Sequence, residues 1–195
     1  MSLREKKKDR TRLQLLEAAL DLIERQGFAE TTISQIAEAV EVSSRTVLRY
    51  FATKEDVIVS WVEDGMATFL ASLEQRPADE PAPASLIASA RDMLASYQAK
   101  SNFYLTIERV IAAVPAVSAR KQELSAALAA KVTKILNARK GGGERFALAN
   151  ELYPIVIFSV MRVAISQWVA FNGARPLVEV FDEAVSLVQF SPLDA

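Results

Sequence analysis

The chain has 195 residues, 51% of them hydrophobic, and its 23 basic and 24 acidic side chains leave a formal net charge of −1. This length and apolar content suffice for a small domain joined to a larger one. Because cysteine and histidine are both absent, the sequence offers no disulfide, no thiol nucleophile and none of the commonest general bases and metal ligands. No glycine-rich phosphate loop occurs either, so we expect no enzymatic activity, no metal and no cofactor.

The first element in chain order is a basic N-terminal segment, although the whole chain is nearly neutral. Residues 1–12 contain only two carboxylates against the cations Arg4, Lys6, Lys7, Lys8, Arg10 and Arg12. Such a segment can contact DNA phosphates or a minor groove, and the alternative is a solvated, disordered tail. It lacks an apolar leader, so a cytoplasmic location is expected.

An amphipathic helix is predicted over residues 8–26, with Gly27 ending it. Its apolar stripe consists of Leu13, Leu16, Leu20 and Ile23, widened by Ala19.

Residues 32–54 are predicted to form two short helices joined by a tight turn, followed by the start of another helix. Thr32 and Gln35 have the spacing of a capping box, and Ser43 can cap the second short helix. Val47 and Phe51 lie on one face of that helix and can close a small three-helix core. This layout is that of a helix-turn-helix head, whose second helix enters the DNA major groove.

The opposite face of the second short helix carries Arg45 and Arg49, four residues apart, with Leu48 beside them. Arginine can bind the O6 and N7 atoms of guanine together, and an apolar side chain can touch a thymine methyl group. The alternative is an ordinary solvated face, but the capped helix that precedes it at this spacing favours DNA binding.

A further capping signature begins the next helix. Thr53 and Asp56 are three residues apart, and Lys54 occupies the first helical position. A cation there opposes the helix dipole, and a DNA phosphate nearby would compensate. The alternative is an exposed lysine without a role.

Residues 42–51, together with Lys54 and Glu55, resemble the signature of the TetR-type family of helix-turn-helix transcriptional regulators. The resemblance covers about the first quarter of the chain and implies two domains: a DNA-binding head at residues 1–53 and a helical effector-binding and dimerisation domain at residues 54–195. It also implies phosphate contacts for the residues at Thr32, Ser43, Thr46, Tyr50 and Lys54. Approach to base edges is implied for Ser44, Arg45 and Arg49.

Two positions depart from the family pattern. Glu41 stands where the family commonly has glycine, so a positive φ there would carry some cost. Leu48 replaces a frequent aromatic residue, which puts one phosphate or sugar contact in doubt.

The remainder of the chain keeps a helical period throughout. A helix is expected over residues 54–75, followed by a proline-rich break at residues 76–83. Later helices are expected around residues 86–97, 103–114, 124–136, 152–171 and 177–188, with Pro115 ending one and the glycine triplet 141–143 preceding the last two. No β-type alternation competes, so the predicted fold is all-α with about nine helices.

Residues 152–171 are the most apolar stretch and are long enough to span a membrane. Ser159, Arg162 and Ser166 form a polar stripe along it, however, and a charged arginine inside a lipid bilayer is costly. Burial on two sides, against its own domain and a partner subunit, is the better explanation. The resemblance implies a homodimer that forms through the two C-terminal helices.

The resemblance also implies a pocket for a small effector between the central helices. The apolar composition there favours a hydrophobic or amphipathic molecule. A fatty acyl derivative is suggested by the family resemblance alone. Each candidate is equally compatible with an ordinary core position. The candidates are Trp61, Met66, Phe69, Met93, Tyr97, Phe103, Tyr104 and Ile107.

We therefore expect a ligand-responsive regulator, most simply a repressor, that binds a partly palindromic operator in double-stranded DNA as a dimer. The alternative is a helical small-molecule-binding protein whose DNA recognition is weakened or lost, and Glu41, Leu48 and the pI of 5.7 favour that reading.

Overall fold

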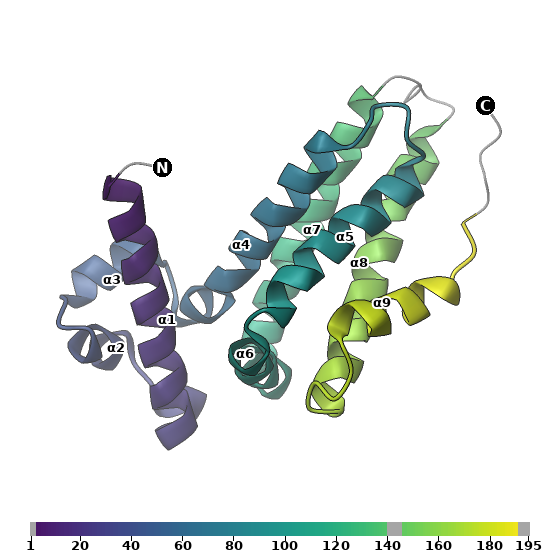
Figure 1. Cartoon of the computed structure of the whole chain (residues 1–195). Coiled ribbons are helices and arrows are strands. Elements are labelled where there is room, and N and C mark those ends of the chain that lie inside the picture. Colours follow the sequence, from purple (N-terminus) through teal and green to yellow (C-terminus); the bar gives the residue numbers. More distant parts are fainter. Residues whose placement is uncertain (1–2, 140–145, 191–195) are drawn as a thin grey trace. The chain divides into compact units, whose positions relative to one another are not determined.

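The computed structural model describes residues 3–139 and 146–190, and within them every regular element is a helix (Figure 1). This confirms the predicted all-α fold. The helices are α1 (Leu3–Glu30), α2 (Ile33–Ala39), α3 (Ser44–Tyr50), α4 (Lys54–Gln75), α5 (Ala82–Gln98), α6 (Ser101–Ala113), α7 (Pro115–Ala138), α8 (Ala147–Ala170) and α9 (Leu177–Ser186). The glycine triplet at residues 141–143 lies outside the described residues.

The chain divides into two compact units. Unit 1 comprises Met1–Val62 and Arg109–Lys121, and unit 2 comprises Glu63–Glu108 and Gln122–Ala195. Three helices, α4, α6 and α7, therefore contribute residues to both units. The segment that contains the end of α6 and the start of α7 groups with the N-terminal helices, which the sequence did not indicate.

The carboxyl ends of α4 to α9 lie within two residues of the expected positions, and α4 has the predicted bounds. Helices α5, α7 and α8 begin earlier than expected, at Ala82, Pro115 and Ala147. The first helix is longer than expected: α1 begins at Leu3 rather than at residue 8. Residues 3–12 contain no glycine or proline, and lysine, arginine and glutamate are good helix formers. Pro115 ends α6 as predicted and also begins α7, because proline fits the first helical position, where no amide donor is needed.

Gly27 interrupts α1 as expected, since its φ of 83° and ψ of 163° are not helical. The apolar stripe of α1 differs in one residue. Leu15 is fully buried and Leu16, Ala19, Leu20 and Ile23 are buried with it, whereas Leu13 is 40% exposed. Leu13 was therefore wrongly assigned to the core, because the helical period alone accepts either leucine at the edge of the stripe.

Unit 2 has a core of large side chains from several helices. Tyr97, Phe69, Leu73, Leu86 and Ile107 are each less than 2% exposed. Phe69 of α4 packs edge-on against Phe158 of α8, with ring centroids 5.2 Å apart. Burial of such side chains contributes about 1.5–3 kcal/mol each relative to leaving them in water.

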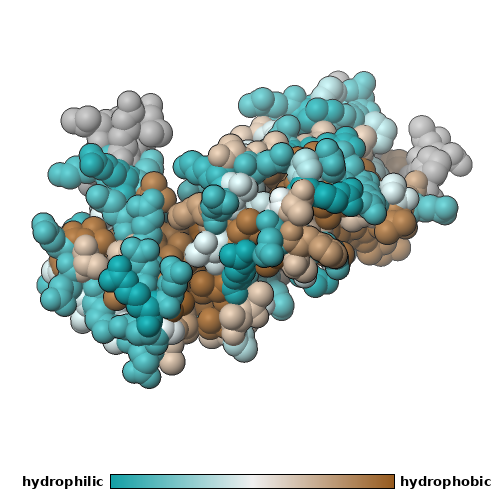
Figure 2. Space-filling view, turned by 60° about the horizontal axis from the view of Figure 1, so that its bottom comes forward, coloured by the Kyte–Doolittle hydropathy of each residue, from teal (hydrophilic) through white to brown (hydrophobic). Residues whose placement is uncertain are grey.

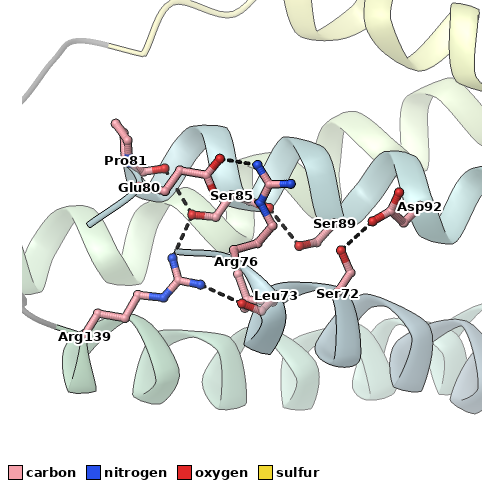
Figure 3. A network of polar contacts seen from close by, with 9 residues as sticks. All are labelled: Ser72, Leu73, Arg76, Glu80, Pro81, Ser85, Ser89, Asp92 and Arg139. Carbon is pink, nitrogen blue, oxygen red and sulfur yellow. Dashed lines mark hydrogen bonds and ion pairs between the residues drawn. The ribbon is translucent and has the colours of Figure 1, made fainter. Parts of the chain in front are cut away.

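A polar network ties the ends of three helices together in unit 2 (Figure 3). Arg139, just after α7, donates to the Leu73 carbonyl oxygen near the end of α4 at 2.7 Å and to Ser85 Oγ in the first turn of α5 at 2.8 Å. Arg76 pairs with Glu80 in the connection between α4 and α5. The Arg76 hydrogen bond lowers the pKa of Glu80, whereas burial lowers the pKa of Arg139. Arg139 thus adds a second donor to the Leu73 carbonyl, which also accepts a hydrogen bond from the Arg76 amide at 3.3 Å.

Candidate nucleic-acid interface

Both short helices of the head have the predicted caps. Thr32 Oγ1 accepts a hydrogen bond from the Gln35 amide at 3.2 Å, and Gln35 Oε1 accepts one from the Thr32 amide at 2.9 Å. This confirms the capping box at the start of α2. At the start of α3, Ser43 Oγ accepts from the Thr46 amide at 3.1 Å. Two helices of seven residues each cannot persist alone, so these caps and the packing described next fix them.

The turn between α2 and α3 contains the strained residue that the sequence predicted. Glu41 has a φ of 56°, in the left-handed region that glycine adopts without penalty. Its amide donates to the Glu38 carbonyl oxygen at 3.0 Å, and the Val42 amide donates to the Ala37 carbonyl oxygen at 2.9 Å. These two bonds hold the chain through the turn despite the conformational cost.

Helix α3 has one buried face and one exposed face. Val47 is fully buried and Phe51, which follows the helix, is 4% exposed. Arg45, Leu48 and Arg49 are exposed, Leu48 by 52%. The Arg49 guanidinium lies 5.4 Å from the centroid of the Tyr50 ring. An exposed apolar side chain between two exposed arginines suits a surface that meets base edges and methyl groups.

The other predicted contact residues lie at the ends and sides of the same two helices. Thr32 and Ser43 are exposed, although their hydroxyls also serve as caps. Ser44, Thr46 and Tyr50 are half-buried. Ser44 Oγ lies 3.2 Å from Ser34 Oγ of α2, an interhelical hydrogen bond that the sequence did not indicate. The structure thus brings the predicted residues of α3 together, while their contacts with DNA remain a prediction.

Lys54 is placed differently from the other predicted contacts. Its Nζ donates to the carbonyl oxygens of Phe28, Ala29 and Thr31, with 2.7 Å to Thr31 and 3.4 Å to Ala29. It also lies 4.1 Å from the centroid of the Phe28 ring. The capping box formed by Thr53 and Asp56 is present as predicted, with two bonds of 3.1 Å. Carbonyl oxygens near the end of α1 therefore bind the cation at the start of α4, and its contact with a DNA phosphate remains a prediction.

The first turn of α4 makes a second long-range contact within unit 1. Arg120 Nε donates to Asp56 Oδ1 at 2.7 Å, and the side chains are 40% and 16% exposed. Lys121 lies over the Trp61 ring, 5.3 Å from its centroid. The contact between Arg120 and Asp56 could not be predicted from the sequence, because 64 residues separate the two.

Unit 1 also has a surface groove of about 470 Å³, lined by residues of α1, by the end of α2 and by the turn. Glu17, Asp21 and Glu41 give it an acidic character against a single cation, Arg25. Its lining includes none of the predicted DNA-binding or effector-binding residues. An acidic groove repels phosphates, so we assign it no role in DNA binding.

The predicted effector residues divide between the units. Trp61 belongs to unit 1, whereas the other seven belong to unit 2. Trp61, Phe69, Met93, Tyr97 and Ile107 are at most 7% exposed, and Met66, Phe103 and Tyr104 are half-buried.

Two tyrosines of unit 2 form a stacked pair. The rings of Tyr97 and Tyr104 are 4.4 Å apart and inclined by 18°. Burial, followed by the negative charge of Glu108, raises the pKa of Tyr97 well above its ordinary value, so its phenol is neutral. An aromatic pair with two hydroxyls can orient a bound molecule, but it can equally be core.

Helix α8 carries an apolar face that its own unit does not cover. Leu148, Leu152, Ile155 and Val163 recur at helical spacing and are 80%, 50%, 51% and 46% exposed. Figure 2 shows one face of the molecule, on which hydrophobic patches lie among hydrophilic side chains.

Among the described helices, α8 alone is long and apolar enough to cross a membrane, a test that buried core helices also pass, and 44% of its most apolar window is buried. Ser159, Arg162 and Ser166 are exposed on it, so the polar stripe shares the uncovered side. A polar stripe that includes a charged arginine is more compatible with a protein interface than with the interior of a lipid bilayer.

A family model described as bacterial regulatory proteins, tetR family, matches residues 15–60, which include the head from α1 into α4. The HTH-type transcriptional regulator TcmR of Streptomyces glaucescens is 34% identical over 145 residues, which cover 71% of this chain and 64% of TcmR. The head of this chain, residues 15–60, belongs to the tetR family. The fatty acid metabolism regulator protein of Bacillus subtilis is 23% identical over 188 residues, covering 90% of this chain and 92% of that protein. Both relatives are named as regulators rather than enzymes, in agreement with the expectation from the sequence.

Solved structures of tetR-family proteins share the fold. Thermus thermophilus FadR in complex with lauroyl-CoA superposes with a TM-score of 0.59 at 22% identity, covering 94% of this chain and 99% of that one. Bacillus subtilis FadR in complex with stearoyl-CoA gives 0.57 at 20% identity, covering 90% and 96%. At these identities the likeness extends to the fold alone.

Proposed function

We propose that this protein is a DNA-binding transcriptional regulator whose α3 reads base edges in the major groove. The observation that carries the proposal is the exposed triad Arg45, Leu48 and Arg49 on a capped, well-packed α3. Arg45 and Arg49 supply bidentate donors for guanine, and Leu48 supplies an apolar contact for a thymine methyl group. Ser44 lies at the amino end of the same helix, where base contacts concentrate in this motif.

The phosphate contacts that we propose come from neutral side chains around α2 and α3. Thr32, Ser43, Thr46 and Tyr50 carry hydroxyls that can donate to phosphate oxygens and so fix the head on the duplex. The basic residues in the amino-terminal part of α1 add electrostatic attraction that depends on salt but not on the DNA sequence. The family resemblance adds Lys54 to this set, although carbonyl oxygens already surround its ammonium.

Specific binding by such a small head requires two copies. We propose a homodimer formed through α8 and α9, supported by the uncovered apolar face of α8. A two-fold dimer places its recognition helices on half-sites about 34–36 Å apart, so a partly palindromic operator follows from the symmetry.

The effector that we propose is a hydrophobic or amphipathic small molecule, bound in the cytoplasm by unit 2. The aromatic and aliphatic composition around Tyr97 and Tyr104 supports this class. Two structural relatives are named as complexes with acyl-CoA molecules, which makes lauroyl-CoA and stearoyl-CoA the first candidates to test. Repression is the simplest scheme, in which ligand binds unequally to two dimer states and only one state fits the operator.

The test is a mobility-shift titration with the DNA that flanks the gene, with and without lauroyl-CoA. Arg45→Ala is expected to weaken binding by about 1–3 kcal/mol and to relax preference at one operator position. Lys134→Ala is the matched control, because Lys134 is an exposed cation of α7 in unit 2, outside the head and outside the proposed dimer interface. Equal losses for both variants would refute the base-reading role of Arg45. Binding that never responds to an acyl-CoA would refute that ligand class and leave the DNA-binding proposal standing.

A further inference from the structure

Backbone carbonyl oxygens surround the Lys54 ammonium, so that Lys54 links two segments of unit 1, and we call this set of contacts the anchor. A lysine ammonium has three N–H donors. In unit 1 the three nearest acceptors are the carbonyl oxygens of Phe28, Ala29 and Thr31, and the ring of Phe28 faces the same charge. Every donor therefore has an acceptor inside the protein. A phosphate would have to compete with those carbonyls for this ammonium.

The carbonyls that Lys54 binds belong to the end of α1 and the residue after it, where a helix leaves acceptors without amide partners. The neighbouring carbonyls are satisfied by other side chains: Thr31 Oγ1 donates to Gly27 at 2.8 Å, and Gln26 Nε2 donates to Glu30 at 2.9 Å. A cation at this position also complements the negative end of the helix dipole. Lys54 thus donates hydrogen bonds to the carboxyl end of α1, although it lies 23 residues after Thr31.

The anchor acts next to the DNA-reading part of the head. Thr31 is 1% exposed, and the following residue is Thr32, the cap of α2 and a proposed phosphate contact. By holding the Thr31 carbonyl at 2.7 Å, Lys54 joins the α1–α2 junction to the first turn of α4. The same turn contains Asp56, which pairs with Arg120 of α7. The start of α4 is therefore fixed on two sides within unit 1.

We propose that Lys54 is a positioning residue, which locks the α1–α2 junction to the start of α4 and thereby sets the placement of the head, and that it makes no phosphate contact. This inference rests on the proposed DNA-binding function and differs from the role that the family resemblance implies for this lysine. In a dimer, a looser junction would let each head move relative to α4. The spacing between the two recognition helices would then be less sharply defined.

The experiment compares Lys54→Met, Lys54→Arg and wild type at a temperature where circular dichroism shows all three folded. The DNA is an operator selected from random sequences with wild-type protein, together with versions whose half-sites are moved by one or two base pairs. Affinity is measured across several salt concentrations. Lys131→Met is the matched control, since Lys131 is an exposed lysine of α7 in unit 2.

Each head of the dimer carries one Lys54, so loss of one phosphate contact per head would make the slope of log affinity against log salt shallower by about 1.8. For Lys54→Met we expect an unchanged slope, with affinity about 5- to 30-fold lower at every salt concentration, and a flattened preference for half-site spacing. Lys54→Arg should lose part of the affinity although its charge remains, because a planar guanidinium cannot reproduce three bonds from one compact ammonium. Lys131→Met should match wild type in every respect.

Hydrogen exchange without DNA gives an independent readout. The amides of residues 31–36 should exchange faster in Lys54→Met than in wild type, whether or not the chain binds DNA. A shallower salt slope for Lys54→Met, with unchanged exchange and a wild-type Lys54→Arg, would show a direct phosphate contact and overturn the proposal. An unchanged spacing preference would overturn the positioning role as well. If wild type itself selects no operator, the DNA-binding function fails, while the exchange result still decides whether the anchor exists.

Discussion

Gly65→Ala should destabilise unit 2 although it replaces a glycine in the interior of a helix. Gly65 lies in α4 opposite Tyr97 of α5, and a Cβ atom built on it would overlap Tyr97 Oη and lie 3.2 Å from Cε1 and Cζ. Tyr97 is 2% exposed and stacks on Tyr104, so its ring has little room to retreat. The glycine permits a close approach of α4 to α5.

The magnitude follows from two opposing effects. An added methyl group in a packed core costs about 1–3 kcal/mol. Alanine gains about 0.8–1.0 kcal/mol over glycine in a helix interior. The net expectation is a loss of about 1 kcal/mol, which lowers the thermal midpoint of a chain of this size by about 2–4 °C.

The assay is urea unfolding of a double-mutant cycle with Tyr97→Phe. Removing the hydroxyl removes the overlap, so Gly65→Ala should be neutral or stabilising by up to about 1 kcal/mol in the Tyr97→Phe background. The sign of the alanine effect should therefore change between the two backgrounds. Equal destabilisation in both would refute the explanation by contact with Tyr97 Oη.

Three further predictions concern the turn, the buried phenol and the proposed dimer. Glu41→Gly should stabilise the head by about 1 kcal/mol in urea unfolding, because glycine adopts a φ of 56° freely. A destabilised variant would show that Glu41 is held by interactions that outweigh its strain. Burial raises the pKa of Tyr97 above its unfolded value, so the unfolded chain loses this proton first as the pH rises. The free energy of unfolding should therefore fall above about pH 10, by up to about 1.4 kcal/mol per pH unit. The Tyr97→Phe variant should show a smaller fall, and an identical fall would contradict the assignment. Ile155→Asp should shift the chain to monomer in sedimentation by placing a charge in the proposed interface, whereas Ala126→Asp, at an exposed position of α7, should leave the dimer intact.

The local features of the head could be predicted because short-range rules determine them. The capping boxes at Thr32 and at Thr53 each depend on residues within a few positions of one another. The positive φ of Glu41 was expected only from the family pattern, which commonly has glycine at this position. The exposure of Leu13 could not be decided, since Leu13 and Leu15 lie on opposite edges of the apolar stripe and the helical period does not show which edge is covered.

The contacts that give the site its geometry are long-range and stayed hidden in the sequence. Lys54 meets carbonyls 23 to 26 residues before it, and Arg120 meets Asp56 across 64 residues. Backbone carbonyls carry no side-chain signal, so only the fold reveals that they surround the ammonium. Gly65 did leave a usable signal, because a glycine inside a helical pattern often marks a close approach.

The most direct test of the central claim compares the affinity for the DNA upstream of the gene with the affinity for scrambled DNA of the same composition. The ratio of the two affinities is measured with the intact chain at a fixed salt concentration near physiological strength. Specific regulators prefer their sites by about 10³-fold or more. We predict a large ratio for wild type, and a ratio at least tenfold smaller for Arg45→Ala. A wild-type ratio of one would contradict the assignment of α3 as a recognition helix.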